Sequence, residues 1–300
     1  MSIVVVGSVA LDDVFTDHGA LENIPGGSAL YFSAAASLFV PVSMVGVIGD
    51  DFPFNELDFL KKRGVRIDDL KIIKGGKTFR WGGKYETDMN KRTTTNLELN
   101  VFENFTPVLD EKSRKAEYVF LGNINPELQL DVIKQIENPK FIGADTIECY
   151  IQNSPGILKQ VLEKVNIVIF NDEEARLLTG EFNLIKAAKA LLKFGPEYVI
   201  VKKGEHGSIF TSDQGLFLIP AFPVENVIDP TGAGDSFAGG VMGHISKTGK
   251  TDSANIRKAI TYGGVTASFT VEEFGPNRLK NITFQDIEKR MEEFRSMTNF

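Results

Sequence analysis

A short run of small residues before Asp235 is the part of this sequence best suited to chemistry. Residues 229–235 read Asp-Pro-Thr-Gly-Ala-Gly-Asp, between a strand-like run that ends near residue 228 and apolar residues at helical spacing over 237–245. Gly232 and Gly234 can adopt backbone angles closed to larger residues, and they let main-chain N–H groups approach a ligand. Because the N-terminus of a helix attracts anions, we predict an anion hole built from Gly232, Ala233 and Gly234.

Asp235 lies at the edge of this predicted anion hole. A carboxylate there opposes the binding of phosphate alone, but it is useful if a hydroxyl group must lose its proton while it attacks a phosphorus atom. We therefore interpret Asp235 as a base in phosphoryl transfer. The competing interpretation is a glycine-rich turn whose aspartate caps a helix, and for an isolated Gly-Ala-Gly-Asp it is the better one.

The elements that must position this site alternate between short apolar runs and helical patterns. Strands are predicted at 3–6, 43–48, 118–121, 141–144, 167–170 and 198–201, with helical patterns between them, for example over 128–136 and 184–191. Strands rich in Val and Ile and separated by helices predict a parallel sheet covered on both faces, which binds ligands beyond the carboxyl ends of its strands. The uncharged run 29–48 contains Pro41, and we interpret it as a buried helix and a buried strand rather than a membrane span.

Two stretches, about 12–24 and 75–105, lack this alternation. The second has extended runs on either side of Gly82 and Gly83, for which we predict a turn between two strands. A small antiparallel sheet on an α/β core usually acts as a lid or a subunit contact, and a decorative hairpin is the alternative. We therefore expect residues 1–300 to form a single domain with a lid. A homodimer through the lid would cover its exposed face, although a monomer fits nearly as well.

The string of residues 229–240 resembles the second signature of the PfkB (ribokinase-like) family of carbohydrate and nucleoside kinases. Further matches follow in the right order over nearly the whole chain. The resemblance implies a ribokinase-like three-layer α/β/α domain with a mainly parallel central sheet and a small antiparallel β lid. It also implies an enzyme of this family that moves the γ-phosphoryl of ATP to a hydroxyl of a small sugar or nucleoside, with Asp235 as the base.

On the acceptor side, the resemblance rests on two segments. Residues 7–12, Gly-Ser-Val-Ala-Leu-Asp, match the family segment whose aspartate accepts hydrogen bonds from substrate hydroxyls, which implies that role for Asp12. Residues 25–31 match the first glycine pair of the family, so the resemblance places the backbone of Gly26 and Gly27 against the acceptor. Tyr31 stands where the family usually has asparagine, which leaves the identity of the acceptor open.

One further acceptor-side residue and one cation site follow from the resemblance. Asn125 occupies the place where ribokinases often carry a glutamate that faces the substrate. Asp229 matches a position at which many members bind a monovalent cation. A requirement for K⁺ is left open.

On the ATP side, Asn171 and Glu174 match the N-x-x-E motif of the family, which orders Mg²⁺ and phosphate through water. Residues 202–207 resemble the nucleotide-binding segment, which implies ATP contacts for Lys202, Gly204 and Gly207. A lysine can pair with ATP phosphates as a point charge. Thr231 of the glycine loop is assigned to the same side, and the implied cofactors are ATP and Mg²⁺.

The composition of the whole chain argues against several other classes. A net charge of −7 and a pI of about 5.2 argue against nucleic acid as the main partner. No basic segment precedes the first apolar run, so we expect no signal peptide, no membrane partner and a cytoplasmic protein. Three histidines and the single Cys149, which we expect to be buried, give no metal-ligand pattern. A nicotinamide dehydrogenase is a poor alternative because the Gly-x-Gly-x-x-Gly motif is missing.

Two alternatives remain open. The acceptor is a sugar or a nucleoside with equal weight, since aromatic residues of the predicted lid could stack on a base or could form the lid's own hydrophobic face. These aromatic residues are Phe79, Trp81, Tyr85 and Phe102. The other alternative is a catalytically inactive nucleotide- or sugar-binding sensor of the same fold, which the combination of Asp235 with both glycines of its loop opposes.

Overall fold

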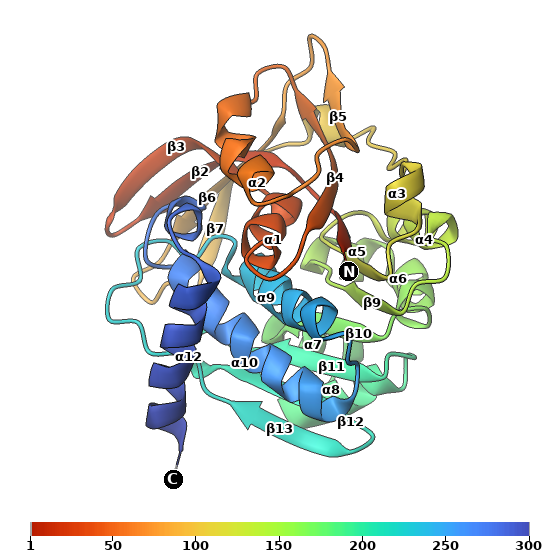
Figure 1. Cartoon of the computed structure of the whole chain (residues 1–300), viewed down its shortest axis with the longest axis vertical. Coiled ribbons are helices and arrows are strands. Elements are labelled where there is room, and N and C mark those ends of the chain that lie inside the picture. The colour runs from red at the N-terminus through yellow and green to blue at the C-terminus, as the bar shows by residue number, and fades with distance from the viewer. Residues whose placement is uncertain (1, 300) are drawn as a thin grey trace.

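The structure is a computed structural model that describes residues 2–299, and it consists of a nine-stranded sheet between two layers of helices with a second, four-stranded sheet beside it (Figure 1). The large sheet has the order β13-β12-β11-β10-β9-β8-β1-β4-β5, in which only β12 and β13 run antiparallel to their neighbours. The predicted mainly parallel sheet is therefore confirmed. Its strands are β1 (Ile3–Val6), β4 (Val42–Gly49), β5 (Leu70–Ile73), β8 (Tyr118–Leu121), β9 (Phe141–Ala144), β10 (Ile167–Asn171), β11 (Tyr198–Lys202), β12 (Ser208–Ser212) and β13 (Gly215–Ile219).

The apolar strand residues supply two hydrophobic cores, one on each face of the large sheet. In β1, Ile3 and Val5 belong to one core, whereas Val4 and Val6 belong to the other. Successive side chains of a strand point to opposite faces, so a strand covered by helices on both sides is apolar throughout. This is the physical reason why the short apolar runs of the sequence mark the strands so closely.

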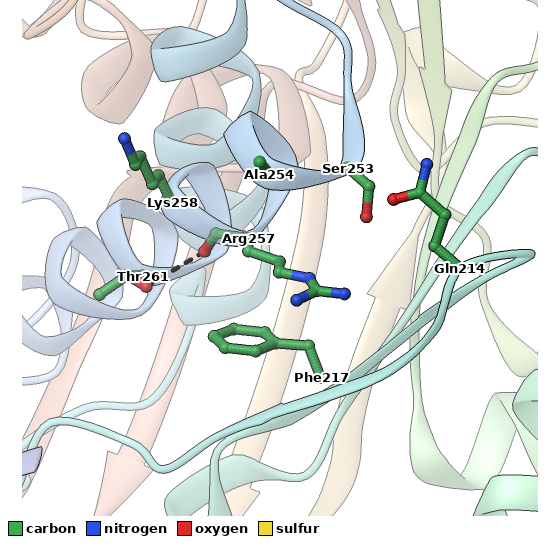
Figure 2. Close-up of a pocket in the computed structure, with 7 residues that line it drawn as sticks. All are labelled: Gln214, Phe217, Ser253, Ala254, Arg257, Lys258 and Thr261. Carbon is green, nitrogen blue, oxygen red and sulfur yellow. Dashed lines mark hydrogen bonds between the residues drawn. The ribbon is translucent and has the colours of Figure 1, made fainter.

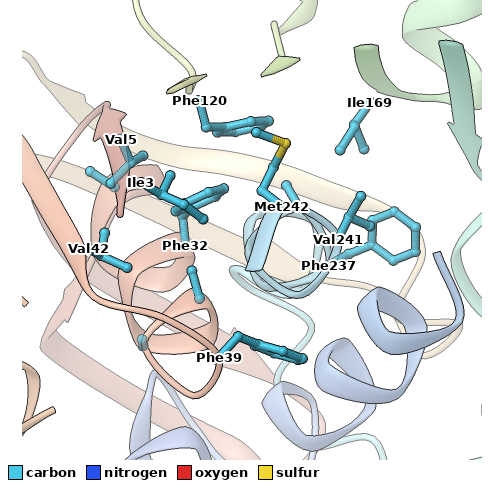
Figure 3. Packing of buried hydrophobic residues seen from close by; sticks show 14 of the residues in the cluster. Ile3, Val5, Phe32, Phe39, Val42, Phe120, Ile169, Phe237, Val241 and Met242 are labelled. Carbon is cyan, nitrogen blue, oxygen red and sulfur yellow. The ribbon is translucent and has the colours of Figure 1, made fainter. Parts of the chain in front are cut away.

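Helices cover both faces. The layer on the first core contains α1 (Ser28–Ala36), α9 (Ala233–Thr248), α10 (Ser253–Thr270) and α12 (Phe284–Thr298), and the layer on the second contains α4 (Pro126–Gln135), α6 (Pro155–Leu162), α7 (Asp172–Thr179) and α8 (Leu184–Leu192). The shorter helices are α2 (Asp58–Lys62), α3 (Glu111–Arg114), α5 (Glu148–Asn153), α11 (Asn277–Lys280) and the 3₁₀ turns η1 (Phe54–Leu57), η2 (Asn100–Phe102) and η3 (Gly204–His206). In Figure 3, Phe32 of α1 and Met242 of α9 meet the ring of Phe120 from the sheet, and the two phenylalanine rings stack with centroids 4.6 Å apart.

Glycines let α9 approach both of its neighbouring helices at backbone distance. A Cβ atom on Gly239 would lie 2.6 Å from the carbonyl oxygen of Phe32 in α1. A Cβ on Gly240 would lie 2.9 Å from the Cα of Gly263 in α10. Contacts this close fix the position of α9, and hence of the loop that precedes it.

The second sheet has the order β3-β2-β6-β7 and contains the two stretches predicted to form a lid. Its outer pairs are antiparallel, whereas β2 and β6 in the middle run parallel. The strands are β2 (Ala10–Thr16), β3 (Gly19–Gly26), β6 (Phe79–Tyr85) and β7 (Arg92–Glu98). We call this four-stranded sheet the lid.

The turn predicted at Gly82 and Gly83 is wrong. Both glycines lie inside β6, where the pairing with β7 shifts register between them, and the chain reverses at residues 86–91 instead. Since any side chain at Gly83 would overlap the indole ring of Trp81, the glycines serve a bulge and a close packing contact.

Two other predictions have clear outcomes. The run 29–48 forms all of α1 except its first residue and most of β4, and no helix among residues 2–299 is long and apolar enough to cross a membrane. Cys149 is exposed on α5, so the prediction that it is buried is wrong. In α5 it is Ile151 that faces the interior.

The close contact between α9 and α10 can be tested at two adjacent glycines of α10. A Cβ on Gly263 would lie 2.6 Å from Val241 and 2.8 Å from the carbonyl oxygen of Phe237, whereas a Cβ on Gly264 meets no heavy atom within 4 Å. We expect Gly263→Ala to lower the free energy of unfolding by about 1–3 kcal/mol through overpacking. Gly264→Ala should raise it by up to about 1 kcal/mol, because alanine restricts the unfolded chain more. Urea unfolding of both variants measures the difference, and equal effects would contradict the contact.

Candidate active site

The loop before α9 is held in a conformation that only glycine adopts easily. Gly232 is the N-cap of α9 with φ 75° and ψ 0°, in the left-handed region. A Cβ at this position would overlap the ring of Tyr31, which lies buried beneath the loop. Among residues 2–299, no side chain caps α9, so its first N–H groups are not used by a capping side chain.

The three residues of the predicted anion hole differ in how their N–H groups are used. The N–H of Ala233 donates to the carbonyl oxygen of Pro230 at 3.2 Å and closes a turn. The N–H groups of Gly232 and Gly234 have no hydrogen-bond partner among residues 2–299. The free donors at the start of α9 therefore come from the two glycines.

Asp235 stands in the first turn of α9 and is half-buried. Desolvation and the nearby charge of Asp145 raise the pKa of Asp235 to about 7, against the opposing effect of Lys202 and Arg92. A carboxyl group with this pKa exchanges its proton near neutral pH.

Lys202 links Asp235 to the ends of three neighbouring strands. It closes β11, its Nζ donates to Asp145 Oδ2 at 3.0 Å, and a Cβ on Gly234 would lie 3.1 Å from the same Nζ. Asp145 directly follows β9, and Glu174 follows β10. Burial lowers the pKa of Lys202, but the three surrounding carboxyl groups offset this and raise it, so the lysine is charged.

Asn171 and Glu174 form a reciprocal cap at the start of α7. The N–H of Glu174 donates to Asn171 Oδ1 at 2.8 Å, and the N–H of Asn171 donates to Glu174 Oε2 at 2.7 Å. Burial and the charge of Asp145 raise the pKa of Glu174 to about 8. The N-x-x-E pattern therefore places a buried carboxyl group beside Lys202.

Asp12 and Gly26, two of the predicted acceptor-side residues, lie against each other on β2 and β3 of the lid. The carboxylate of Asp12 packs on the Cα of Gly26, so that any side chain at position 26 would overlap it. Burial, followed by the charges of Asp229 and Asp235, raises the pKa of Asp12 well above its usual value, while the N–H of Gly27 lowers it. Three carboxyl groups thus influence one another across this part of the site.

Asp229 ties the glycine loop to the segment after α10. It is fully buried, and its two carboxylate oxygens accept hydrogen bonds from the N–H groups of Thr231 (2.8 Å) and Gly275 (2.9 Å). Burial raises its pKa. It forms no ion pair with any of the residues that the structure describes, so a small cation would fit the chemistry of this buried carboxylate.

Two polar side chains follow β8, at Asn123 and Asn125. Asn125 is the N-cap of α4, and its Oδ1 accepts the N–H of Glu127 at 3.0 Å. The Oδ1 of Asn123 is buried and has no partner among the described residues. Asn123 therefore offers a second polar group beside Asn125, which stays the predicted acceptor-side residue. The hydroxyl of Tyr31, close to Gly275, is also buried without a partner.

The lid contacts the loops of the candidate site at two points. The hydroxyl of Tyr85 lies 3.1 Å from Thr231 Oγ1, and Asn90 Nδ2 donates to Glu205 Oε1 at 3.2 Å. Asn90 also lies against Gly204, which has φ 54°. Beside these contacts, a cavity of about 680 Å³ is lined by Tyr85 and other residues at the end of the lid.

The backbone conformation at two positions of the predicted nucleotide loop favours glycine. Gly204 and Gly207 have φ of 54° and 80°, and a side chain at Gly207 would overlap the carbonyl oxygen of Ile219. The loop is held at the end of β11, next to Lys202.

Of the four aromatic residues predicted for the lid, only Tyr85 has a polar contact with the glycine loop among residues 2–299. Phe79 and Phe102 stack on each other with centroids 5.2 Å apart, and Trp81 carries the guanidinium of Arg92 at 5.6 Å from the ring centroid. Phe102 lies in η2, outside the lid, and packs against the second hydrophobic core, so this stack joins β6 of the lid to the core of the large sheet.

Comparison with known proteins identifies the family. Residues 2–282 match the pfkB family of carbohydrate kinases. The chain belongs to this family. It is a sugar or nucleoside kinase, as the resemblance of the Asp235 loop predicted.

Relatives and solved structures agree with this assignment. The cytidine kinase of Thermococcus kodakarensis is 29% identical over 254 residues, which cover 82% of this chain and 89% of the relative. The nucleoside kinase of Methanocaldococcus jannaschii is 27% identical over 91% of both chains, and its crystal structure superposes with a TM-score of 0.78 at 22% identity over 97% of this chain and 98% of that one. A putative ribokinase II from E. coli in complex with ATP and Mg²⁺ gives a TM-score of 0.80 at 19% identity, covering 97% and 99%. The ribokinase-like fold is therefore confirmed.

Sequence reasoning missed three residues of the candidate site. Asp145 follows the predicted strand 141–144 directly, and this position at the carboxyl end of a parallel strand was an available signal. Asn123 stands two residues after the end of β8, at the same edge of the sheet. Arg92 gave no signal, since only the folding of the lid brings its charge near Asp235 and Glu174.

The influence of Asp145 on Asp235 can be measured directly. Asp145→Asn removes the negative charge that helps to raise the pKa of Asp235 and leaves Lys202 in place, so this pKa should fall below 7. Carbon-13 NMR titration of the aspartate carboxyl groups would show the change. The control is Asp213→Asn, which removes an exposed carboxylate from the turn between β12 and β13. An unchanged pKa of Asp235 in Asp145→Asn would contradict the coupling.

Proposed function

We propose that this kinase transfers the γ-phosphoryl group of ATP to a hydroxyl of a ribose-containing acceptor, with Asp235 as the base. The observation that carries the proposal is the position of Asp235. A carboxyl group with a pKa of about 7 stands one residue beyond Gly234, whose free N–H lies at the start of α9.

In the proposed reaction, the acceptor hydroxyl attacks the γ-phosphorus while Asp235 accepts its proton. The bond between the γ-phosphorus and the bridging oxygen breaks, and ADP leaves with the electron pair of that bond. The N–H groups of Gly232 and Gly234 face the charge that develops on the transferring group. Ala233 contributes the turn that orients them, because its own N–H is bonded to Pro230.

Positive charge at the site comes from few side chains. Lys202, held by Asp145 beside Gly234, is proposed to face the ATP phosphates, and Arg92 of the lid is proposed to add a second charge. Among residues 2–299, no group of three or more His, Cys, Asp or Glu side chains is arranged to hold a metal ion. ATP phosphates and water would therefore supply most ligands of Mg²⁺, with Glu174 as the proposed water-mediated contact.

Asp12, the backbone of Gly26 and Gly27, and Asn123 are proposed to hold the acceptor. Asn125 would act indirectly, through the start of α4. The nucleotide would contact Gly204, Gly207 and Thr231. The hydroxyl of Thr231 is hydrogen-bonded to Tyr85 of the lid. Closure of the lid would exclude water, which otherwise competes for the phosphoryl group.

The relatives favour a ribose unit in the acceptor. The first is named a cytidine kinase, and others are named nucleoside kinase and ribokinase. Cytidine, other ribonucleosides and ribose share a ribose ring. Asp229 is proposed to bind a monovalent cation, because it is a buried carboxylate without an ion-pair partner in residues 2–299.

An acceptor screen tests the proposed activity. We expect ADP release from Mg²⁺-ATP with at least one of ribose, cytidine, uridine, adenosine, guanosine and inosine, measured with and without K⁺. Parallel reactions without acceptor give the rate of ATP hydrolysis. Tight ATP binding with no turnover on any acceptor would instead favour the inactive nucleotide- or sugar-binding sensor.

The role of Asp235 can be tested separately. Asp235→Asn should lower kcat by roughly 10²–10⁴, about 3–5 kcal/mol of barrier, while ATP still binds, because the amide cannot accept the proton. In the unaltered enzyme, kcat/KM should rise with pH through about 7 as Asp235 ionises. Steady-state kinetics of Asp235→Asn and of the unaltered enzyme over a range of pH measures both effects. The control is Asp131→Asn, which removes an exposed carboxylate from α4. Full turnover in Asp235→Asn would exclude it as the base.

A further inference from the structure

A second cavity lies between β13 and the N-terminal half of α10. Its volume is about 390 Å³, and its lining includes Gln214, Phe217, Ser253, Ala254 and Arg257 (Figure 2). The candidate active site is near the other end of α10, where Val271 and Gly275 contact the Asp229 segment. Arg257 precedes the last residue of α10 by 13 positions, about 20 Å at 1.5 Å per residue. The cavity is thus separate from the site of phosphoryl transfer.

Arg257 brings an uncompensated positive charge to this cavity. Its guanidinium lies over the ring of Phe217, 5.6 Å from the centroid, and its buried Nε has no hydrogen-bond partner among residues 2–299. No ion pair is formed by Arg257 in the same part of the chain. The partly buried Arg63 differs, since it donates to several main-chain carbonyl oxygens. A half-buried guanidinium without partners calls for an anion, because unpaired charge is costly away from water.

Ser253 is an independent second donor. It is 2% exposed, and its Oγ is buried without a partner among the described residues. In Figure 2 this oxygen and the guanidinium of Arg257 face a common space, the amide oxygen of Gln214 is turned towards Ser253, and the ammonium group of Lys258 points away. Ser253 is also the first residue of α10, an 18-residue helix whose N-terminal dipole favours negative charge.

Two carboxylates adjoin this group in the sequence, and they limit which ligands fit. Asp252, the N-cap of α10, uses Oδ1 to accept the N–H of Asn255, and Asp213 is exposed next to Gln214. Neither is paired with Arg257. A ligand must therefore carry enough charge and enough hydrogen-bond acceptors to engage Arg257 and Ser253 in their presence.

We propose that this cavity binds a small metabolite through a phosphate monoester group. The dianion matches the guanidinium of Arg257 and the hydroxyl donor of Ser253. A volume of about 390 Å³ falls in the range of small-molecule sites, roughly 300–1,000 Å³, and leaves room for an organic part. That part would lie against Phe217 and Ala254.

Isothermal titration calorimetry with a loaded active site tests the proposal. The protein is first saturated with Mg²⁺ and adenylyl imidodiphosphate, so that the γ-phosphate of the analogue occupies the candidate anion hole. Ribose 5-phosphate, inorganic phosphate and ribose are then titrated. We expect one site for ribose 5-phosphate, weaker binding of inorganic phosphate, and no binding of ribose at this site.

Variants assign the binding to the cavity. Arg257→Gln should weaken binding of ribose 5-phosphate by about 10- to 100-fold, and Ser253→Ala should weaken it less. Arg114→Gln removes the same charge from the exposed surface of α3 and should leave binding unchanged. Arg257→Lys, which keeps the charge but loses the planar fork, should bind with intermediate affinity and serves if Arg257→Gln fails to fold.

Three results would overturn the proposal. The first is the absence of saturable binding of ribose 5-phosphate to the loaded protein. The second is an equal loss of affinity in Arg257→Gln and Arg114→Gln. The third is equal affinity for inorganic phosphate and ribose 5-phosphate, which would mean an adventitious ion only. Each result is independent of turnover, so a failure here is distinguishable from a failure of the proposed phosphoryl transfer.

Discussion

The left-handed turn at Gly232, resting on the ring of Tyr31, is the constraint on which the rest of the candidate site depends. It sets the direction in which α9 leaves the loop. It therefore also sets the positions of the N–H groups of the two glycines and of the carboxyl group of Asp235. Asp229 holds the residues before Gly232 in place, because its carboxylate accepts the N–H groups of Thr231 and Gly275. The glycine contacts of α9 with α1 and α10 hold the helix itself, so the loop has little freedom to move relative to the sheet.

The electrostatics follow from placing one lysine among several carboxyl groups in a partly dry site. Lys202 is paired with Asp145, while burial and then the charge of Asp145 raise the pKa of Glu174 to about 8 and that of Asp235 to about 7. These two groups therefore hold their protons more tightly than exposed carboxyl groups do. A base that ionises near pH 7 combines a useful ionised fraction with real affinity for a proton, as proton transfer from a hydroxyl requires.

The lid is coupled to both predicted halves of the site. Tyr85 meets the glycine loop at Thr231, while Asn90 meets the nucleotide loop at Gly204 and Glu205. A lid that opened would break both contacts at once and carry Arg92 away from Asp235. In the proposed closure of the lid, the same small sheet would form both contacts and bring the positive charge of Arg92 towards Asp235.

The sequence by itself determined the large sheet and the glycine loop. Strands buried on both faces must be apolar throughout, and a left-handed turn at a helix start must be glycine, so both features are local and visible in the residues. Asp235 was identifiable for the same reason, because its loop is contiguous.

Tertiary structure alone decided which separate segments meet. Strand order brought Asp145 to Lys202, and pairing in the lid brought Arg92 towards Asp235. The side chain of Asn125 caps a helix, whereas Asn123 Oδ1 has no partner among the described residues. Gly83, which was expected in a turn, lies at a bulge of β6 against the ring of Trp81. Such outcomes depend on packing between residues far apart in the chain, which no local pattern records.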